Sequence, residues 1–218
     1  MRYAAVIFDF EGTLVDFQWR LGPAEAELRR EFAALGFAGG EFARGNYAGM
    51  WNAAADLLAQ QGRMAELREA LCPVYDRWDC DALSRWAPRP GAARLLRELA
   101  ARKSRAGMVS NIGRRALDEA LGRFGMTRWL SPVVSRDDVT WMKPRAQGIL
   151  RVLSEWQLAP GDVLFVGDSL ADVFGARAAG MPVAIVRGGE CNEGVFADAP
   201  PEHMIARLDD LAELIGAA

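Results

Sequence analysis

Short apolar runs alternate with amphipathic helical stretches along most of the 218-residue chain, and this alternation restricts its fold more than any other feature. The runs are rich in β-branched side chains and are bounded by turn residues, as in strands that are buried on both faces. Five of them are expected to be strands: residues 4–8, 106–109, 133–134, 163–166 and 183–186. Apolar residues three or four positions apart predict helices over residues 90–102, 114–124 and 144–156.

This pattern predicts an α/β fold, with a doubly wound, mainly parallel sheet and helices on both faces. The segment from residue 17 to residue 87 departs from it, because its helical stretches at 23–35, 46–61 and 64–75 occur without a convincing strand. We therefore predict a core domain of residues 1–16 and 88–218 and an inserted α-helical cap domain of residues 17–87. In such folds the functional residues gather at the carboxyl ends of the strands.

Charge and hydropathy exclude several classes of partner. The 26 basic and 29 acidic residues give a net charge of -3 and form no run of like charge, so nucleic acid is not expected to bind. No apolar segment approaches the roughly 18 residues of a membrane span. We expect a cytoplasmic protein without membrane contact, acting as a monomer or a homodimer.

The cysteines and the histidine limit the chemistry further. Cys72, Cys80 and Cys191 are odd in number and form no CxxC pair, so reduced thiols are expected rather than disulfides or a zinc site. His203 is the only histidine and lies near the C-terminus, which argues against histidine-based triads and multi-histidine metal sites. Any hydrolytic chemistry must therefore depend on carboxylates, hydroxyls and lysine.

Two carboxylates follow the first predicted strand. Asp9 and Glu11 are two positions apart, so their side chains project to the same side of an extended chain. One carboxylate could attack a substrate while the other handles a proton, and Gly12 comes directly after them. A strand end with incidental acidic residues is the alternative interpretation of this stretch.

Asp168 and Asp172 follow the predicted strand at 163–166 and should lie beside the first pair. Together with Asp9 they offer hard oxygen ligands, and Mg²⁺ usually takes one or two carboxylates along with waters and a phosphate oxygen. A helix N-cap is the alternative explanation for residues 167–169. The sequence thus indicates a magnesium site without requiring one.

Ser110, Asn111 and Lys143 complete the polar set. The first two end the predicted strand at 106–109, and Lys143 follows the loop at 137–142. A hydroxyl, backbone amides and an ammonium are what a transferring phosphoryl group needs around it. Each residue is weak evidence alone, since a serine after a strand is usually a turn residue and a lone lysine is usually solvated.

These motifs occur in one order, and the chain resembles the haloacid dehalogenase superfamily throughout its length. The first motif of that family, Asp-x-Asp-Gly-Thr, is matched by residues 9–13, Asp-Phe-Glu-Gly-Thr. The second motif corresponds to Ser110, the third to Lys143, and the fourth to Asp168 with Asp172. Residues 163–186 look like the branch that contains phosphoglycolate phosphatase and β-phosphoglucomutase, which carries a helical cap after the first motif.

The resemblance implies a magnesium-dependent phosphatase for a small phosphorylated metabolite, phosphoglycolate-like or a sugar phosphate. Asp9 would attack phosphorus and form an aspartyl-phosphate, while Glu11 would protonate the leaving oxygen and later activate water. The resemblance assigns phosphate binding to Gly12, Ser110, Asn111 and Lys143. It assigns magnesium binding to Asp9, Asp168, the carbonyl of Glu11 and, through water or an indirect contact, Asp172.

Glu11 departs from the family pattern, because phosphatases of the family usually have aspartate at this position. The extra methylene moves the carboxylate outward by about 1.5 Å, and misplacement on this scale can cost on the order of a hundredfold in rate. A slow or non-catalytic phosphate-binding protein is therefore one alternative. A haloacid dehalogenase or a phosphomutase is a second, although Glu11 and Asp168 argue against a dehalogenase. A phosphonatase would need a lysine in the cap, and residues 17–87 contain none.

Periodicity does not show which residues of the cap contact a substrate. Arg44, Asn46, Tyr47 and Trp51 are candidates because they lie at or near a predicted helix start, where anion-binding groups gather. Four tryptophans either form the core of the cap or face a substrate or partner: Trp19, Trp51, Trp78 and Trp86.

Overall fold

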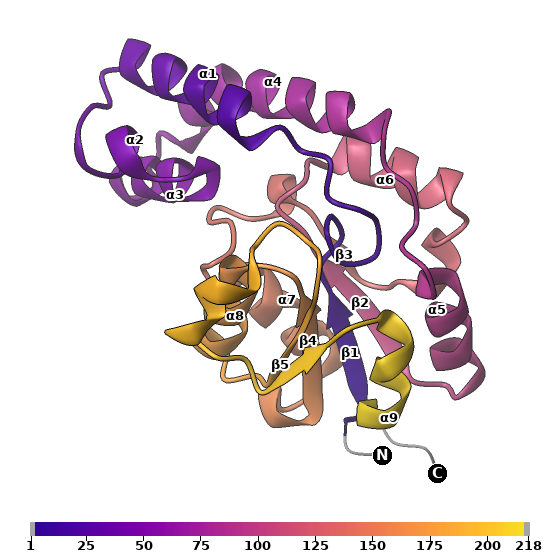
Figure 1. Ribbon diagram of the computed structural model, residues 1–218. Coiled ribbons are helices and arrows are strands. Elements are labelled where there is room, and N and C mark those ends of the chain that lie inside the picture. Colours follow the sequence, from indigo (N-terminus) through magenta and orange to yellow (C-terminus); the bar gives the residue numbers. More distant parts are fainter. Residues whose placement is uncertain (1–2, 216–218) are drawn as a thin grey trace.

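A parallel sheet forms the centre of the computed structural model, which describes residues 3–215 (Figure 1). The strands are β1 (Ala5–Phe8), β2 (Arg105–Val109), β3 (Val133–Val134), β4 (Val163–Gly167), β5 (Val183–Val186) and β6 (His203–Ile205). Their order is β3-β2-β1-β4-β5-β6, and every neighbouring pair is parallel. The predicted doubly wound α/β fold is therefore confirmed.

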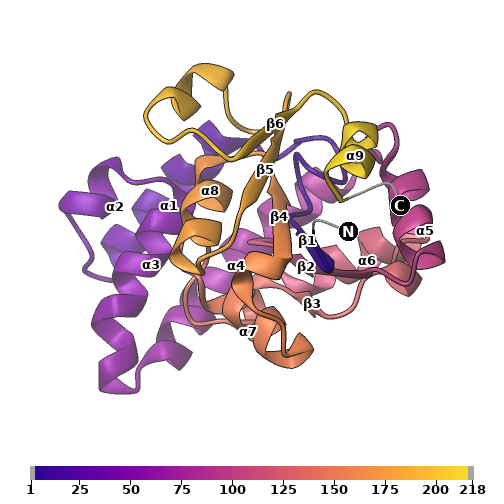
Figure 2. The same cartoon turned by 90° about the horizontal axis from the view of Figure 1, so that it is seen from below.

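Helices cover both faces of this sheet, and β1 shows why. Val6 and Phe8 belong to one apolar cluster and Ala5 and Ile7 to the other, since alternate side chains of a strand point to opposite faces. The first cluster includes residues of α5 (Ala92–Ala101), α6 (Arg114–Arg123) and α9 (Leu211–Ile215). The second includes residues of α7 (Gln147–Trp156) and α8 (Leu170–Ala178), and Figure 2 shows helices on both sides of the strands. Within residues 3–215, no helix has the length and apolarity needed to span a membrane.

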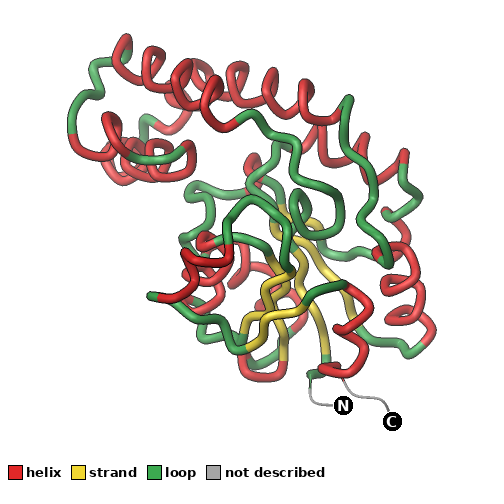
Figure 3. Tube along the Cα trace, viewed as in Figure 1, coloured by secondary structure: helices red, strands yellow, loops and turns green. Residues whose placement is uncertain are grey.

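The segment between β1 and α5 is helical. It contains α1 (Leu21–Ala34), α2 (Gly40–Arg44), α3 (Tyr47–Leu58) and α4 (Met64–Leu83), and no strand occurs within residues 17–87. These helices lie beyond the carboxyl ends of the strands (Figures 1 and 3). We call residues 17–87 the cap, although its boundaries as a separate domain stay a prediction.

Helix α4 is longer than the predicted stretch at 64–75, because it continues through Pro73 to Leu83. Its buried face begins with apolar residues, Leu67, Leu71 and Val74, but then includes Asp79. A carboxylate therefore stands where an apolar residue would extend the helical pattern. No sequence pattern predicts a partner for this carboxylate, because its partner, Arg136, lies in the core.

The chain passes between core and cap twice, at residues 15–19 and at residues 86–88, and these two crossings lie side by side. The backbone N–H of Asp16 donates to the carbonyl of Ala87 at 3.0 Å, and the Oδ1 of Asp16 accepts the N–H of Ala87 at 2.7 Å. Val15 and Pro88 also form an antiparallel bridge. The two crossings therefore hold each other in place. The first of them follows Asp9 and Glu11 by only a few residues.

Candidate functional site

The predicted polar residues meet at the carboxyl ends of three adjacent strands. Phe8 at the end of β1 is in register with Met108 of β2 and Val166 of β4, so the residues that follow these strands share one edge of the sheet. Asp9, Ser110 and Asp168 are all buried there. A cavity of about 30 Å³, called the Asp9 cavity below, is lined by residues that include Asp9, Glu11, Ser110, Asn111, Lys143 and Glu190.

Lys143 joins two carboxylates in this site. Its Nζ donates to Oδ1 of Asp9 at 2.6 Å and to Oδ1 of Asp172 at 2.7 Å, and all three side chains are buried. Burial alone would lower the pKa of Lys143, but the negative charges of Asp172 and Asp9 outweigh it and raise the pKa above its usual value. Lys143 is therefore an ammonium that keeps the Asp9 carboxylate in place.

Three buried carboxylates lie close together in this site. Asp9, Asp168 and Asp172 each offer an oxygen within 4.8 Å of the others. Burial raises the pKa of Asp9 to about 6, against the lowering effect of Lys143, and burial with the charges of Asp172 and Asp9 raises the pKa of Asp168 well above its usual value. Such shifts arise when buried negative charge exceeds the positive charge around it, which a divalent cation would correct.

The contacts of Asp172 indicate an indirect role. Its Oδ1 accepts from Lys143, and its Oδ2 accepts the backbone N–H groups of Asp168 and Ser169 at 3.0 Å and the Ser169 hydroxyl at 2.8 Å. These bonds form a capping box at the start of α8. Both oxygens of Asp172 are therefore engaged, and it orients Lys143 and Asp168.

Asp168 is held by neighbouring loops. Its Oδ1 accepts from the Thr13 hydroxyl at 2.9 Å, and its Oδ2 accepts the backbone N–H of Glu190 at 2.6 Å. Gly12 has a φ of +82°, and a Cβ there would lie 2.1 Å from Oδ2 of Asp168. Gly12, which was expected to bind phosphate, thus packs against Asp168, and it is not among the described residues that line the Asp9 cavity.

Glu11 is held by both crossings between core and cap. Its Oε1 accepts the backbone N–H groups of Gln18 at 2.8 Å and Trp19 at 2.7 Å, and the indole N–H of Trp86 at 2.7 Å. Burial raises the pKa of Glu11 to about 8, against the lowering effect of the Trp86 hydrogen bond. Glu11 is therefore protonated at neutral pH, and because Oε1 accepts three hydrogen bonds the proton belongs on Oε2.

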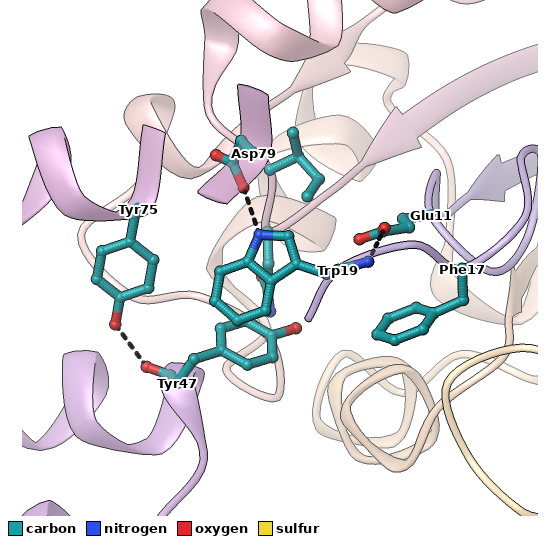
Figure 4. A pocket seen from close by; sticks show the side chains of 8 residues that line it. Glu11, Phe17, Trp19, Tyr47, Tyr75 and Asp79 are labelled. Atoms are coloured by element: carbon teal, nitrogen blue, oxygen red, sulfur yellow. Dashed lines mark hydrogen bonds between the residues drawn. The ribbon is translucent and has the colours of Figure 1, made fainter. Parts of the chain in front are cut away.

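The four cap residues that were candidates for substrate contact occupy different environments. Tyr47 lines the Asp9 cavity, whereas Arg44 is exposed and Asn46 caps α3 by accepting the Gly49 N–H at 2.8 Å. Trp51 is fully buried and donates to the Thr140 carbonyl at 2.9 Å, so it fastens α3 to the core. Of the four tryptophans, Trp19 lines a second cavity beside the first, with Phe17, Tyr47 and Tyr75 (Figure 4).

The amino-acid sequence of the chain is similar to those of known proteins. A family model for haloacid dehalogenase-like hydrolases matches residues 3–180. The chain belongs to this family. It is similar to the phosphoglycolate phosphatase of Photorhabdus laumondii subsp. laumondii, with 28% identity over 216 residues, 97% of this chain and 92% of that protein.

Two further proteins are similar to this hydrolase. The N-acetylmuramic acid 6-phosphate phosphatase of Pseudomonas aeruginosa is 31% identical over 202 residues, covering 87% of this chain and 84% of that protein. A solved haloacid dehalogenase superfamily hydrolase from Geobacter sulfurreducens has a TM-score of 0.61 and 21% identity, covering 99% of this chain and 97% of that one. The structural likeness concerns the fold.

In this haloacid dehalogenase-like hydrolase, a buried ion pair fastens the cap to the core. Arg136 and Asp79 of α4 are both almost fully buried, and the guanidinium donates to Oδ2 of Asp79 at 2.7 Å. The same carboxylate accepts the N–H of Gly113 at 2.9 Å and the indole N–H of Trp19 at 3.1 Å. Asp79 thus connects the loop after Ser110 with the crossing that holds Glu11.

The sequence did not identify Asp79, Arg136 or Glu190 as parts of the site. Asp79 and Arg136 stand 57 positions apart on a helix and a short turn, and neither belongs to a recognisable motif. Glu190 lies in the loop after β5, beyond the last predicted strand. Asp79 offered one clue, because it is a charged residue on the buried face of an amphipathic helix.

Proposed function

We propose that this hydrolase is a magnesium-dependent phosphatase that cleaves small phosphorylated metabolites through an aspartyl-phosphate on Asp9. One observation carries the proposal: the Asp9 carboxylate is buried and held by Lys143 in a cavity that the Glu11 carboxyl group also lines. A nucleophile and a proton donor therefore face the same small space. The names of the relatives above agree with this reaction class.

The reaction follows from the two carboxyl groups. An oxygen of Asp9 attacks phosphorus as the bond between phosphorus and the ester oxygen breaks, and Glu11 gives its proton to that oxygen, so an alcohol leaves. The Glu11 carboxylate then takes a proton from a water that attacks the phosphorus of the aspartyl-phosphate. Orthophosphate leaves, Asp9 is restored, and Glu11 is protonated again for the next cycle.

Ser110, Asn111 and Lys143 would hold the phosphoryl oxygens. Asn111 fixes the relation of two loops, because its side chain donates to the Lys143 carbonyl at 3.2 Å and accepts the Lys143 N–H at 2.9 Å. The ammonium of Lys143 and the hydroxyl of Ser110 thereby stay in one cavity with Asp9. That cavity holds roughly one or two water molecules, so a substrate enters only when the cap moves away.

The acidic cluster fits magnesium. Asp9, Asp168 and the Glu11 carbonyl would bind the ion, and Asp172 would position Asp168 and Lys143. Bound magnesium would neutralise charge on the phosphoryl oxygens and on Asp9. Oxygen ligands of this number and hardness suit Mg²⁺ better than the soft metals that sulfur or several imidazoles would select.

The experiment is hydrolysis of p-nitrophenyl phosphate by the wild type and by Glu11→Asp, with Mg²⁺ and with a chelator. We expect turnover by the wild type that a chelator abolishes and added Mg²⁺ restores. Glu11→Asp should be slower by roughly ten- to a hundredfold, because the shorter side chain pulls the carboxyl group away from three donors at 2.7 to 2.8 Å.

Glu11 also favours a second candidate, a protein that binds phosphate without useful catalysis. That candidate predicts an inert wild type and a gain of activity in Glu11→Asp, the reverse of the first result. Turnover that persists unchanged in the chelator would contradict the role of magnesium. The same assay therefore separates the two functions.

Trp86→Phe should shift the pH dependence of the reaction. The indole N–H stabilises the carboxylate form of Glu11, so its loss should raise the pKa of Glu11 further. For an alkyl phosphate, which needs a proton on its leaving oxygen, kcat/KM should fall above about pH 8 in the wild type, as the acid form of Glu11 is lost. In the variant this fall should move upward by about one pH unit.

A matched control is Trp78→Phe, which removes an indole donor to Glu27 at 2.8 Å elsewhere in the cap. Its pH profile should coincide with that of the wild type. If Trp86→Phe also left the profile unchanged, Glu11 would not be the group that donates the proton.

A further inference from the structure

The second cavity offers space for the alcohol portion of a phosphate ester bound beside Asp9. It shares Glu11, Phe17, Tyr47, Asn111 and Ile112 with the Asp9 cavity, so the two adjoin. Its other walls include the rings of Trp19 and Tyr75, and Figure 4 shows these aromatic side chains around one space. We call it the aromatic cavity; its volume is about 20 Å³.

Positive charge is scarce around both cavities. Among the described residues that line them, Lys143 is the one cation, and it is already paired with Asp9 and Asp172. Arg136 lies behind Asp79 and is bound to that carboxylate and to Asp76. Neither cation is available to a second anionic group on a substrate.

Acidic side chains lie on the same side. Glu190 lines the Asp9 cavity, and Glu25 lies just behind Tyr47, whose backbone N–H it accepts at 3.3 Å. Glu190 does not join the carboxylates grouped within 4.8 Å, which in the described part of the chain are Asp9, Asp168 and Asp172. Its side chain therefore belongs to the wall of the cavity rather than to the acidic cluster.

Local structure holds Glu190 in this position. Its backbone N–H donates to Oδ2 of Asp168 at 2.6 Å, and a Cβ on the preceding Gly189 would lie 2.2 Å from the same oxygen. The glycine thus allows the loop after β5 to approach Asp168 closely. Glu190 is carried to the edge of the Asp9 cavity by this approach.

We propose that the hydrolase selects phosphate esters whose alcohol portion carries no carboxylate, and that Glu190 enforces this choice. The inference rests on the proposed phosphatase function and narrows its substrate class. A carboxylate buried without a cation loses its hydration with no compensation, and nearby carboxylates repel it. Aromatic walls suit an uncharged or cationic group instead. Phosphoglycolate, the substrate in the name of one relative, is then a poor ligand here.

The test compares 2-phosphoglycolate with 2-hydroxyethyl phosphate as inhibitors of p-nitrophenyl phosphate hydrolysis by the magnesium-loaded enzyme. The two compounds have the same chain length and differ in a carboxylate against a hydroxymethyl group. We expect the inhibition constant of phosphoglycolate to be at least about tenfold higher. Glu190→Gln should reduce this ratio several-fold, because it removes a negative charge while it keeps the shape of the side chain.

Glu193→Gln is the control, since Glu193 lies exposed in the same loop with Arg187 3.5 Å away, and it should leave the ratio unchanged. Equal or tighter inhibition by phosphoglycolate in the wild type, no inhibition by either compound, or a ratio that Glu190→Gln does not alter would overturn the inference while the phosphatase function stands. If p-nitrophenyl phosphate itself is not hydrolysed, the proposed function fails first, and the inference fails with it.

Discussion

Replacement of Asp9 by asparagine is expected to lower kcat/KM for p-nitrophenyl phosphate by at least about 10⁴-fold. The amide keeps the size of the side chain but is a poor nucleophile and cannot form the ion pair with Lys143 at 2.6 Å. Steady-state kinetics with Mg²⁺ in excess would measure the loss.

Asp162→Asn serves as the control, because Asp162 is exposed at the opposite end of the sheet, just before β4. It should match the wild type in rate. Both variants should unfold cooperatively, which thermal unfolding followed by circular dichroism would establish. An Asp9→Asn enzyme that kept a tenth of the activity would show that another group attacks phosphorus.

Arg136→Met is expected to lower the free energy of unfolding by about 3–5 kcal/mol, because it leaves the buried Asp79 carboxylate without its cation. The indole of Trp19 and the N–H of Gly113 still bind that carboxylate, but neither carries a charge. Urea unfolding at constant protein concentration would measure the change. Activity should fall as well, since Asp79 links α4 to the crossing that holds Glu11.

Arg145→Met provides the comparison. Arg145 pairs with Asp56 of α3 at 2.5 Å and so also joins core and cap, but both side chains are about half exposed. Solvent weakens such a pair, and its loss should change stability little. If the two variants were equally stable, burial of the Arg136–Asp79 pair would not be what makes its cation important for stability.

The sequence predicted most of the fold because buried parallel strands leave a clear pattern. Each of the five expected strands is present, since each is an apolar run that both layers of helices cover. β6 was missed because two of its three residues, His203 and Met204, are only half-buried and form no such run. Helix α4 was predicted only as far as residue 75, and the part that was missed carries Asp79 on its buried face in place of an apolar residue.

The site could be predicted in part for a geometric reason. Carboxyl ends of adjacent parallel strands share one edge, so Asp9, Ser110 and Asp168 had to lie close together once the strands were placed. The position of the cap relative to the core could not be predicted in this way. The contacts of Glu11 with Trp86, and the wall formed by Tyr47, depend on how helices pack across two crossings, which no local pattern specifies.

The packing of the cap changes the interpretation of Glu11. From the sequence, the extra methylene suggested a misplaced acid. In the structure its Oε1 accepts three hydrogen bonds from the crossings, so the longer side chain has partners that an aspartate would not reach. We therefore expect glutamate to be the working residue at this position.

The measurement that tests the central claim most directly is the location of the phosphoryl group in Glu11→Gln treated with p-nitrophenyl phosphate and Mg²⁺. p-Nitrophenolate leaves without a proton, so attack by Asp9 should proceed, while the amide cannot activate water for the second step. After an acid quench, peptide mapping by mass spectrometry should find the phosphoryl group on Asp9, together with release of one equivalent of p-nitrophenol. Sustained turnover with Asp9 unmodified, or a phosphoryl group on any other residue, would contradict the account.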